Sequence, residues 1–312
     1  MINRRNLRVK ALQTIYAYEA EGKQPTPTEV AKALQTKYQQ TGNLFTYLVT
    51  LTVNTAKYVE VYSNQKASKH LPTTADLNIN TKLAGNDVLW QLQENKTYDQ
   101  AISNGNITAQ VNTELVKELF STLLTTPEYQ HYTTTQARTT PDDVAILQYI
   151  FNQLILQNED IVHTITDLYN NFDDDIDMLI EIVNNTLNKA KHTQFTKLVT
   201  PDKNDFTNLL INTYFSKHQH ILNTISPKLK NWDADRVAKL DMIILNLGVS
   251  EFLYFNTIPT KVTLNEYIDI AKAYSTPQSG QFVNGILDSL LKDLEKSNTL
   301  HKTDYKKTLF PT

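Results

Sequence analysis

The chain contains no cysteine, and only seven of its 312 residues are glycine. Without cysteine it can form neither disulfides nor thiolate metal sites, and it has no cysteine nucleophile. So few glycines argue against a sandwich or barrel, because many short strands need many turns. No apolar run approaches the eighteen or so residues that a membrane-spanning helix requires. The sequence therefore predicts an all-α protein that does not enter a membrane and stays in the reducing cytoplasm.

Motifs for catalysis and metal binding are also missing. The sequence has no G-x-S-x-G elbow and no phosphate-binding glycine loop. The acidic run at residues 173–177 does not continue as a calcium loop, because Met178 stands where the sharp turn needs glycine. We expect Asp173 and Asp233, each after an aromatic residue, to be helix N-caps instead. The sequence thus predicts no catalytic residue, no metal and no cofactor, and hence no enzyme.

The segment from Pro259 to Leu291 predicts two amphipathic helices. In the first, Thr263 and Glu266 have the spacing of a capping box, so we expect the helix to begin at Thr263. In the second, Ser279 is a candidate N-cap, and apolar residues then recur at intervals of three and four.

Asn284 and Gly285 lie inside the second helix without favouring it. A glycine in a helix interior costs about 1 kcal/mol relative to alanine. We therefore expect another group to approach the backbone closely at this position.

Basic residues are concentrated at the N-terminus, although the formal net charge of the chain is -3. The first ten residues hold Arg4, Arg5, Arg8 and Lys10 and no acidic residue. At the start of a helix expected from Arg4 to Glu19, such side chains can contact phosphates, helped by the helix dipole. A solvated helix start without a ligand is the alternative.

An internal repeat is visible at an offset of 60 residues. Residues 140–175 and 200–235 are identical at ten of 36 aligned positions, including the TPD at the start of each. We interpret them as a duplicated helix pair, and two unrelated amphipathic segments are the alternative.

Four segments resemble one protein family. They are NRRNLRVKALQTIYAY from Asn3, FTNLLINTYFSKHQHILNTI from Phe206, RVAKLDMIILNLGVSEFL from Arg236 and IPTKVTLNEYIDIAKAYSTPQSGQFVNGILDSL from Ile258. In residues 1–20 and 204–294 the chain resembles NusB, a family of bacterial transcription antitermination factors. The intervening residues resemble the long insertion of NusB proteins from the Bacteroidetes group.

The resemblance implies a helical protein of two three-helix halves without enzymatic activity. It implies a partnership with NusE, a component of the small ribosomal subunit, and joint binding of the single-stranded boxA element of nascent RNA. The complex would join the RNA polymerase elongation complex with other Nus factors and suppress termination, chiefly in ribosomal RNA operons.

The resemblance also implies roles for individual residues. Aromatic and amide side chains are suited to reading unpaired bases, and arginines to contacting phosphates. The residues expected to contact RNA are Arg4, Arg5, Arg8, Lys10, Thr276, Gln278, Ser279, Phe282 and Asn284, and those expected on the NusE side are Tyr16, Tyr18, Asn265 and Glu266.

We expect four parts along the chain. The first helix of the core and its basic start occupy residues 1–22, and a helical insertion with the repeated helix pair at 140–195 occupies residues 23–200. The rest of the NusB-like core covers residues 201–296, and a flexible tail covers 297–312.

Two other functions fit parts of the pattern. Some ribosomal RNA methyltransferases carry a NusB-like domain, so the chain could assist such an enzyme as an RNA-binding module. It could also be a helical adaptor that binds no RNA, with its arginines simply solvated.

Overall fold

The computed structural model describes residues 1–229 and 237–303. Throughout these residues the secondary structure is helical, with no strand, which confirms the all-α prediction. None of the described helices is both long and apolar enough to cross a bilayer.

The chain divides into two compact units. The long helix α2 (Pro27–Ala67) belongs to both, because the division falls between Thr36 and Lys37. Unit 1 comprises Met1–Ile2 and Lys37–Val199, and unit 2 comprises Asn3–Thr36 and Thr200–Thr312.

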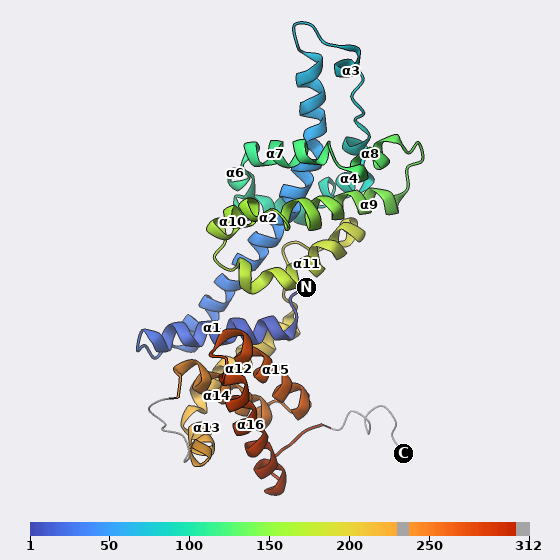
Figure 1. Cartoon of the computed structure of the whole chain (residues 1–312). Helices are drawn as coiled ribbons and strands as arrows, with labels where there is room; N and C mark the ends of the chain where they lie inside the picture. The colour runs from blue at the N-terminus through green and yellow to red at the C-terminus, as the bar shows by residue number, and fades with distance from the viewer. Residues whose placement is uncertain (230–236, 304–312) are drawn as a thin grey trace. The chain divides into compact units, whose positions relative to one another are not determined.

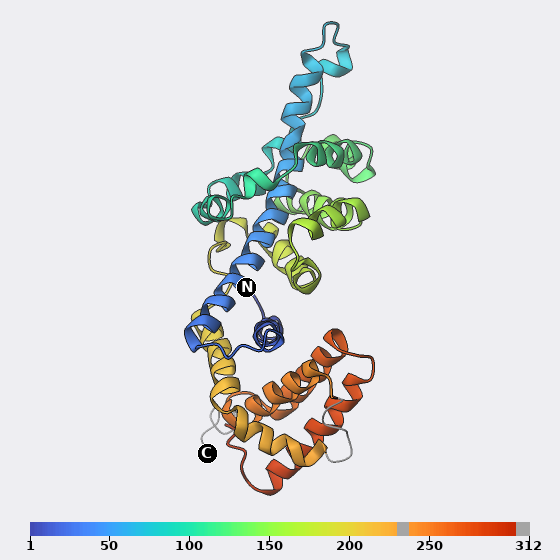
Figure 2. The same cartoon turned by 90° about the vertical axis from the view of Figure 1, so that its left-hand side faces the viewer.

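Unit 1 is built around the greater part of α2. Residues 44–53 of this helix are all buried, and shorter helices lie along it in Figures 1 and 2. Tyr58 contacts Phe120 with ring centroids 5.5 Å apart, and Tyr47 contacts Tyr169 at 5.2 Å. The other helical segments are α3 (Thr74–Leu77), η1 (Lys82–Gly85), α4 (Asp87–Gln93), α5 (Lys96–Gly105), α6 (Ile107–Gln110), α7 (Thr113–Leu123), α8 (Pro127–Thr134), α9 (Thr140–Tyr149), the π-helical η2 (Ile150–Ile155), α10 (Glu159–Leu168), α11 (Phe172–Asn188) and η3 (Ala190–His192).

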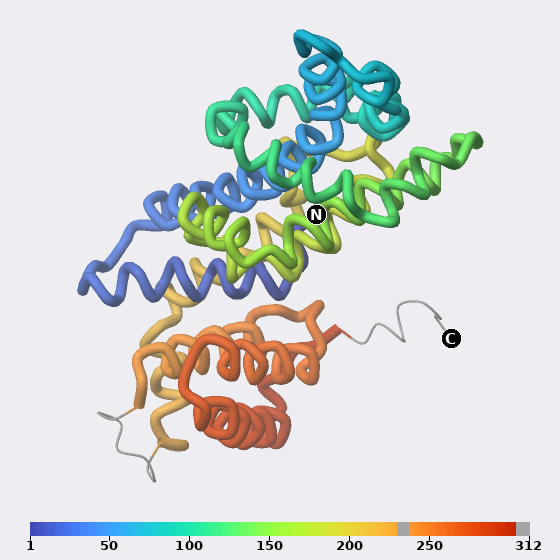
Figure 3. Tube along the Cα trace, turned by 45° about the horizontal axis from the view of Figure 1, so that its top comes forward, coloured from blue at the N-terminus to red at the C-terminus, as the bar shows by residue number. Residues whose placement is uncertain are grey.

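Unit 2 is organised around α14 (Lys239–Tyr254). Every residue from Ile243 to Phe252 is buried, and the helix packs against α1, α12, α13, α15 and α16. An α-helix that is apolar on all sides needs such complete cover. Gly248 allows the close packing, since a Cβ there would lie 3.1 Å from Leu287 of α16. The surrounding segments, seen as tubes in Figure 3, are α1 (Arg4–Ala20), α12 (Pro201–Ser216), α13 (His218–Ile225), η4 (Ser226–Leu229), α15 (Thr260–Tyr274) and α16 (Ser279–Lys296).

The beginning of α2, up to Thr36, is grouped with unit 2. Gln35 donates a hydrogen bond of 3.1 Å to Asn204 on α12. The start of α2 is capped, because Thr26 and Glu29 exchange hydrogen bonds there. The second division, after Val199, precedes α12 directly.

The two segments of the sequence repeat have corresponding helices. Each begins at the TPD sequence with a longer helical stretch, α9 continued by η2 in one and α12 in the other, followed by a shorter helix, α10 or α13. The aligned isoleucines Ile161 and Ile221 are both buried, as are Ile165 and Ile225. Beyond this point the comparison leaves the described residues, since Asp233 and its neighbours lie outside them. The predicted N-cap at Asp173 is wrong: Asn171 occupies that position, and α11 already includes Asp173.

Charge is distributed unequally between the two units. By sequence, unit 1 has 11 lysines and arginines against 18 acidic residues, a net charge of -7. Unit 2 has 19 against 15, a net charge of +4. The small total of -3 therefore conceals one acidic and one basic unit.

Candidate nucleic-acid interface

The four basic residues at the N-terminus do not have one environment. Asn3 caps α1 by accepting a hydrogen bond of 2.9 Å from the Asn6 backbone, so the arginines lie in the first turns. Arg4 and Arg5 are exposed. In contrast, Arg8 and Lys10 each expose only 2% of their surface. Only the first two are therefore free to meet a ligand from solvent.

Arg8 is part of the core of unit 2. Its guanidinium donates two hydrogen bonds to the buried carboxylate of Glu251, at 2.9 and 2.7 Å, and lies over the rings of Phe206 and Tyr267. Burial opposes the charge, but Glu251 outweighs it and raises the pKa of Arg8. The structure thus gives Arg8, one of the residues expected to contact RNA, a paired position in the core without exposure to solvent. Lys10 is buried to the same extent.

The capping box predicted for α15 is also wrong. The helix begins at Thr260, and the Thr263 hydroxyl donates a 2.7 Å hydrogen bond to Glu251 instead of capping. Glu266 turns to the other side of the same cluster, with a carboxylate oxygen 3.5 Å from the Arg8 guanidinium. The buried carboxylate of Glu251 requires donors, and this requirement overrides the local capping pattern.

Unit 2 links the start of α1 to the start of α16. Arg5 lies 3.6 Å from the Asp269 carboxylate on α15, and Lys272 lies 3.6 Å from the same carboxylate. The aliphatic part of Lys272 covers Gly280 in the first turn of α16, where a Cβ would come within 2.6 Å of it. These contacts connect the exposed Arg5 to the start of α16 through Asp269 and Lys272.

The loop before α16 is held in place by the buried hydroxyl of Ser279. Ser279 is 2% exposed and donates a 2.8 Å hydrogen bond to Asp241 on α14. Its oxygen also accepts from the Thr276 backbone at 3.2 Å and contacts the Ser275 hydroxyl at 3.0 Å. Ser279 was the predicted N-cap, but Gln278 occupies that position. The Ser279 side chain is also not exposed for a contact with RNA. Thr276 and Gln278 are exposed.

Glycines in α16 behave differently from the sequence expectation. Apart from the backbone of α16 itself, nothing in residues 1–229 and 237–303 comes within 4 Å of a Cβ placed on Gly285, so no described neighbouring element explains this glycine. The close contact is made at Gly280 instead. Gly285 and Asn284 both lie exposed, and Phe282 is half-buried. The first turns of α16 thus offer an amide, part of an aromatic ring and an open stretch of backbone.

The residues expected on the partner side are mostly accessible. Tyr16 is 44% exposed despite its apolar ring, and Asn265 is exposed. Tyr18 is half-buried. The Glu266 side chain is 27% exposed and already contacts Arg8, so it has a structural role as well.

Comparison with known proteins gives the family. A sequence model described as the NusB family matches residues 174–292. The transcription antitermination protein NusB of Finegoldia magna is 39% identical over 120 residues, which make up 37% of this chain and 86% of that protein. The chain belongs to the NusB family. This confirms the resemblance seen in the sequence.

Other NusB relatives are matched over shorter stretches. The protein of Methylacidiphilum infernorum, also called transcription antitermination protein NusB, is 56% identical over 69 residues, or 22% of this chain and 48% of the relative. That of Salinibacter ruber, of the same name, is 38% identical over 103 residues, or 33% and 64%. No solved structure matches the chain. The chain is longer than these NusB relatives, and most of unit 1 precedes the matched residues.

Three acidic residues that support this surface were not assigned from sequence. The partner of Asp241 could not be read locally, because Ser279 lies 38 residues away. Glu251 stands in an apolar run, which is itself a signal that a buried carboxylate needs donors. Nothing in the sequence marks Asp269 as part of the site, because exposed acidic residues are common on helices.

Proposed function

We propose that this NusB protein is a non-enzymatic transcription antitermination factor that binds boxA-type single-stranded RNA together with NusE. It would act on elongating RNA polymerase with other Nus factors, chiefly in ribosomal RNA operons. The observation that carries the RNA-binding part is the surface that joins Arg5, Asp269, Lys272 and Gly280. The names of the relatives support the antitermination part.

The chemistry of this surface suits unpaired RNA. Arg4 and Arg5 are exposed in a unit of positive net charge and would contact phosphates. The exposed Thr276 and Gln278 and the amide of Asn284 can bond base edges, and the accessible part of Phe282 can stack on a base. Gly285 would let the nucleic acid approach the helix backbone, since no group from another described segment occupies that space.

The partner would bind beside this surface. Tyr16 and Asn265 supply an exposed aromatic ring and an exposed amide, and Tyr18 is partly accessible. Tyrosine is common at the centres of protein interfaces, because its ring buries a large area and its hydroxyl keeps a hydrogen bond. Glu266 would contribute through the part of its carboxylate that remains exposed.

Fluorescence anisotropy of a labelled boxA-type single strand tests the proposal. The full chain is titrated onto this RNA with and without NusE, and onto a strand of shuffled sequence. We expect NusE to tighten binding of the boxA-type strand by about tenfold or more, as cooperative contacts commonly do, and to leave the shuffled strand weak. No RNA binding would instead support a helical adaptor, and binding indifferent to NusE would support a module that serves another RNA enzyme.

A further inference from the structure

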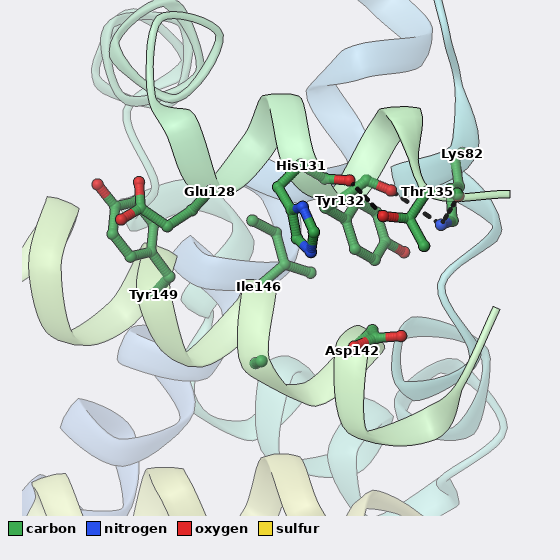
Figure 4. A pocket seen from close by; sticks show the side chains of 9 residues that line it. Lys82, Glu128, His131, Tyr132, Thr135, Asp142, Ile146 and Tyr149 are labelled. Carbon is green, nitrogen blue, oxygen red and sulfur yellow. Dashed lines mark hydrogen bonds between the residues drawn. The ribbon is translucent and has the colours of Figure 1, made fainter. Parts of the chain in front are cut away.

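Unit 1 contains a cavity of about 230 Å³ between α8 and α9. Figure 4 shows side chains from both helices pointing into it, with His131 between Glu128 on one side and Asp142 on the other. It belongs to the acidic unit and is separate from the proposed RNA surface. The cavity is lined by Lys82, Glu128, His131, Tyr132, Thr135, Asp142, Ala145, Ile146 and Tyr149.

The wall of this cavity is firmly built. Tyr132 and Ile146 expose 4% and 3% of their surfaces. The Tyr132 hydroxyl donates a 2.5 Å hydrogen bond to the buried Asp143, whose other oxygen accepts from the Asp87 backbone at 2.8 Å. The ring of Tyr132 is therefore held in place, and the cavity offers a fixed apolar and aromatic surface.

The lysine in the wall is not available to bind an anion. All three donors of the Lys82 ammonium are used, by the carbonyl oxygens of Tyr132, Thr135 and Ala137 at 2.8, 2.7 and 3.0 Å. The same ammonium lies 4.6 Å from the centroid of the Tyr132 ring. This wall therefore already stabilises one cation by a ring face and oxygen atoms.

The charge at the cavity that lacks an ion-pair partner among the described residues is negative. Glu128 and Asp142 are exposed carboxylates, and Asp142 accepts a hydrogen bond from the neutral Thr139 hydroxyl. Glu128 lies beside the Tyr149 ring in Figure 4, and burial together with hydrogen bonding to the Glu128 carboxylate raises the pKa of Tyr149. The net charge of unit 1, -7, would repel a nucleic acid and attract a basic protein.

We infer that this cavity receives an arginine side chain from a basic segment of a partner protein. The aliphatic part of the arginine would pack on Ile146 and the tyrosine rings, and the planar guanidinium would lie on an aromatic face beside Glu128 or Asp142. Arginine fits better than lysine, because it combines stacking with paired hydrogen bonds to a carboxylate. Unit 1 is thereby a protein-binding module, a role additional to the RNA surface of unit 2.

Methyl NMR of the full chain, labelled at isoleucine, tests this inference with N-acetyl-arginine methylamide as the probe. The neutral citrulline analogue is the matched ligand control. We expect the Ile146 methyl signal, assigned with an Ile146→Leu variant, to shift in a saturable manner with the arginine probe. The citrulline probe should bind at least about tenfold more weakly, since it lacks the charge.

The variant Glu128→Gln/Asp142→Asn should weaken arginine binding by about fivefold or more. The control variant Glu114→Gln/Glu118→Gln removes the same formal charge from exposed positions on α7 and should leave binding unchanged. Three results would overturn the inference: no shift at Ile146, equal binding of citrulline, or an equal loss in the control variant. The last would show attraction to the acidic unit as a whole.

Discussion

The hydroxyl of Ser279, at the start of α16, donates a 2.8 Å hydrogen bond to the Asp241 carboxylate on α14. The second oxygen of this carboxylate is buried without a hydrogen bond within the described part of the chain. Asp241 therefore depends on Ser279, and the loop that carries Thr276 and Gln278 depends on both. The pair couples the core of unit 2 to the surface proposed to bind RNA.

A double-mutant cycle at this pair should give strongly non-additive effects. Ser279→Ala leaves the Asp241 carboxylate buried without a donor and should cost about 1–3 kcal/mol of unfolding free energy. The same change made in an Asp241→Ala background should cost much less, because no carboxylate then remains to satisfy. Urea unfolding of the four proteins measures the coupling, and additive effects would show that the hydrogen bond does not stabilise the unit.

Substitution of the buried Arg8 should lower the free energy of unfolding much more than substitution of the exposed Arg5. Arg8→Met leaves Glu251, which is 0% exposed, as an unpaired buried charge and should cost about 3–5 kcal/mol. Arg5→Ala breaks only an exposed ion pair and should cost less than about 1 kcal/mol. Urea unfolding should therefore distinguish them clearly. Equal costs would contradict the assignment of Arg8 to the core and Arg5 to the surface.

Replacement of Gly285 by alanine should raise the stability of the protein and weaken its binding of RNA. A methyl group there meets no other segment in the described part of the chain, so Gly285→Ala should stabilise α16 by up to about 1 kcal/mol. If RNA approaches this part of the backbone, the same methyl group should weaken RNA binding. Thermal unfolding and RNA titration of one variant test both effects. A variant that is more stable and binds RNA as well as the parent protein would remove Gly285 from the proposed surface.

Lys302 should make stability depend on pH. It donates hydrogen bonds to the carbonyls of Glu251 and Phe255 at the end of α14, and burial lowers its pKa from 10.5 to about 8. Between these values the folded chain binds fewer protons than the unfolded chain, so stability should rise with pH.

The control for this prediction is Lys302→Met, which should show a smaller rise in unfolding free energy between pH 7 and roughly 9.5, below the range where tyrosines ionise. Urea unfolding at several pH values measures the two slopes. Identical slopes would show that Lys302 keeps an ordinary pKa in the folded chain.

Much of the fold could be predicted from the sequence, because helix formation depends on periodicity and on the absence of breakers. The apolar spacing in α15 and α16 and the scarcity of glycine were sufficient for the all-α class. The boundaries were less predictable. Thr263 and Glu266 have ideal capping spacing, but Glu251, distant in sequence, uses the Thr263 hydroxyl.

The candidate site was only partly predictable for the same reason. In the sequence, the basic residues Arg4, Arg5, Arg8 and Lys10 cannot be told apart. In the helix, two of them point to solvent and two are buried. Arg8 meets Glu251 across 243 residues of chain, and no local pattern records such a pairing. The family resemblance suggested candidate residues, but only the fold shows which of them are buried, such as Arg8, and which are exposed, such as Arg5.

The most direct test of the account is RNA titration of the Arg4→Gln/Arg5→Gln variant in the presence of NusE at several salt concentrations. Both side chains are exposed, so the variant should unfold like the parent protein. The account predicts weaker binding of the boxA-type strand, with a salt dependence reduced by about one to two phosphate contacts. Unchanged affinity together with an unchanged salt dependence would contradict it.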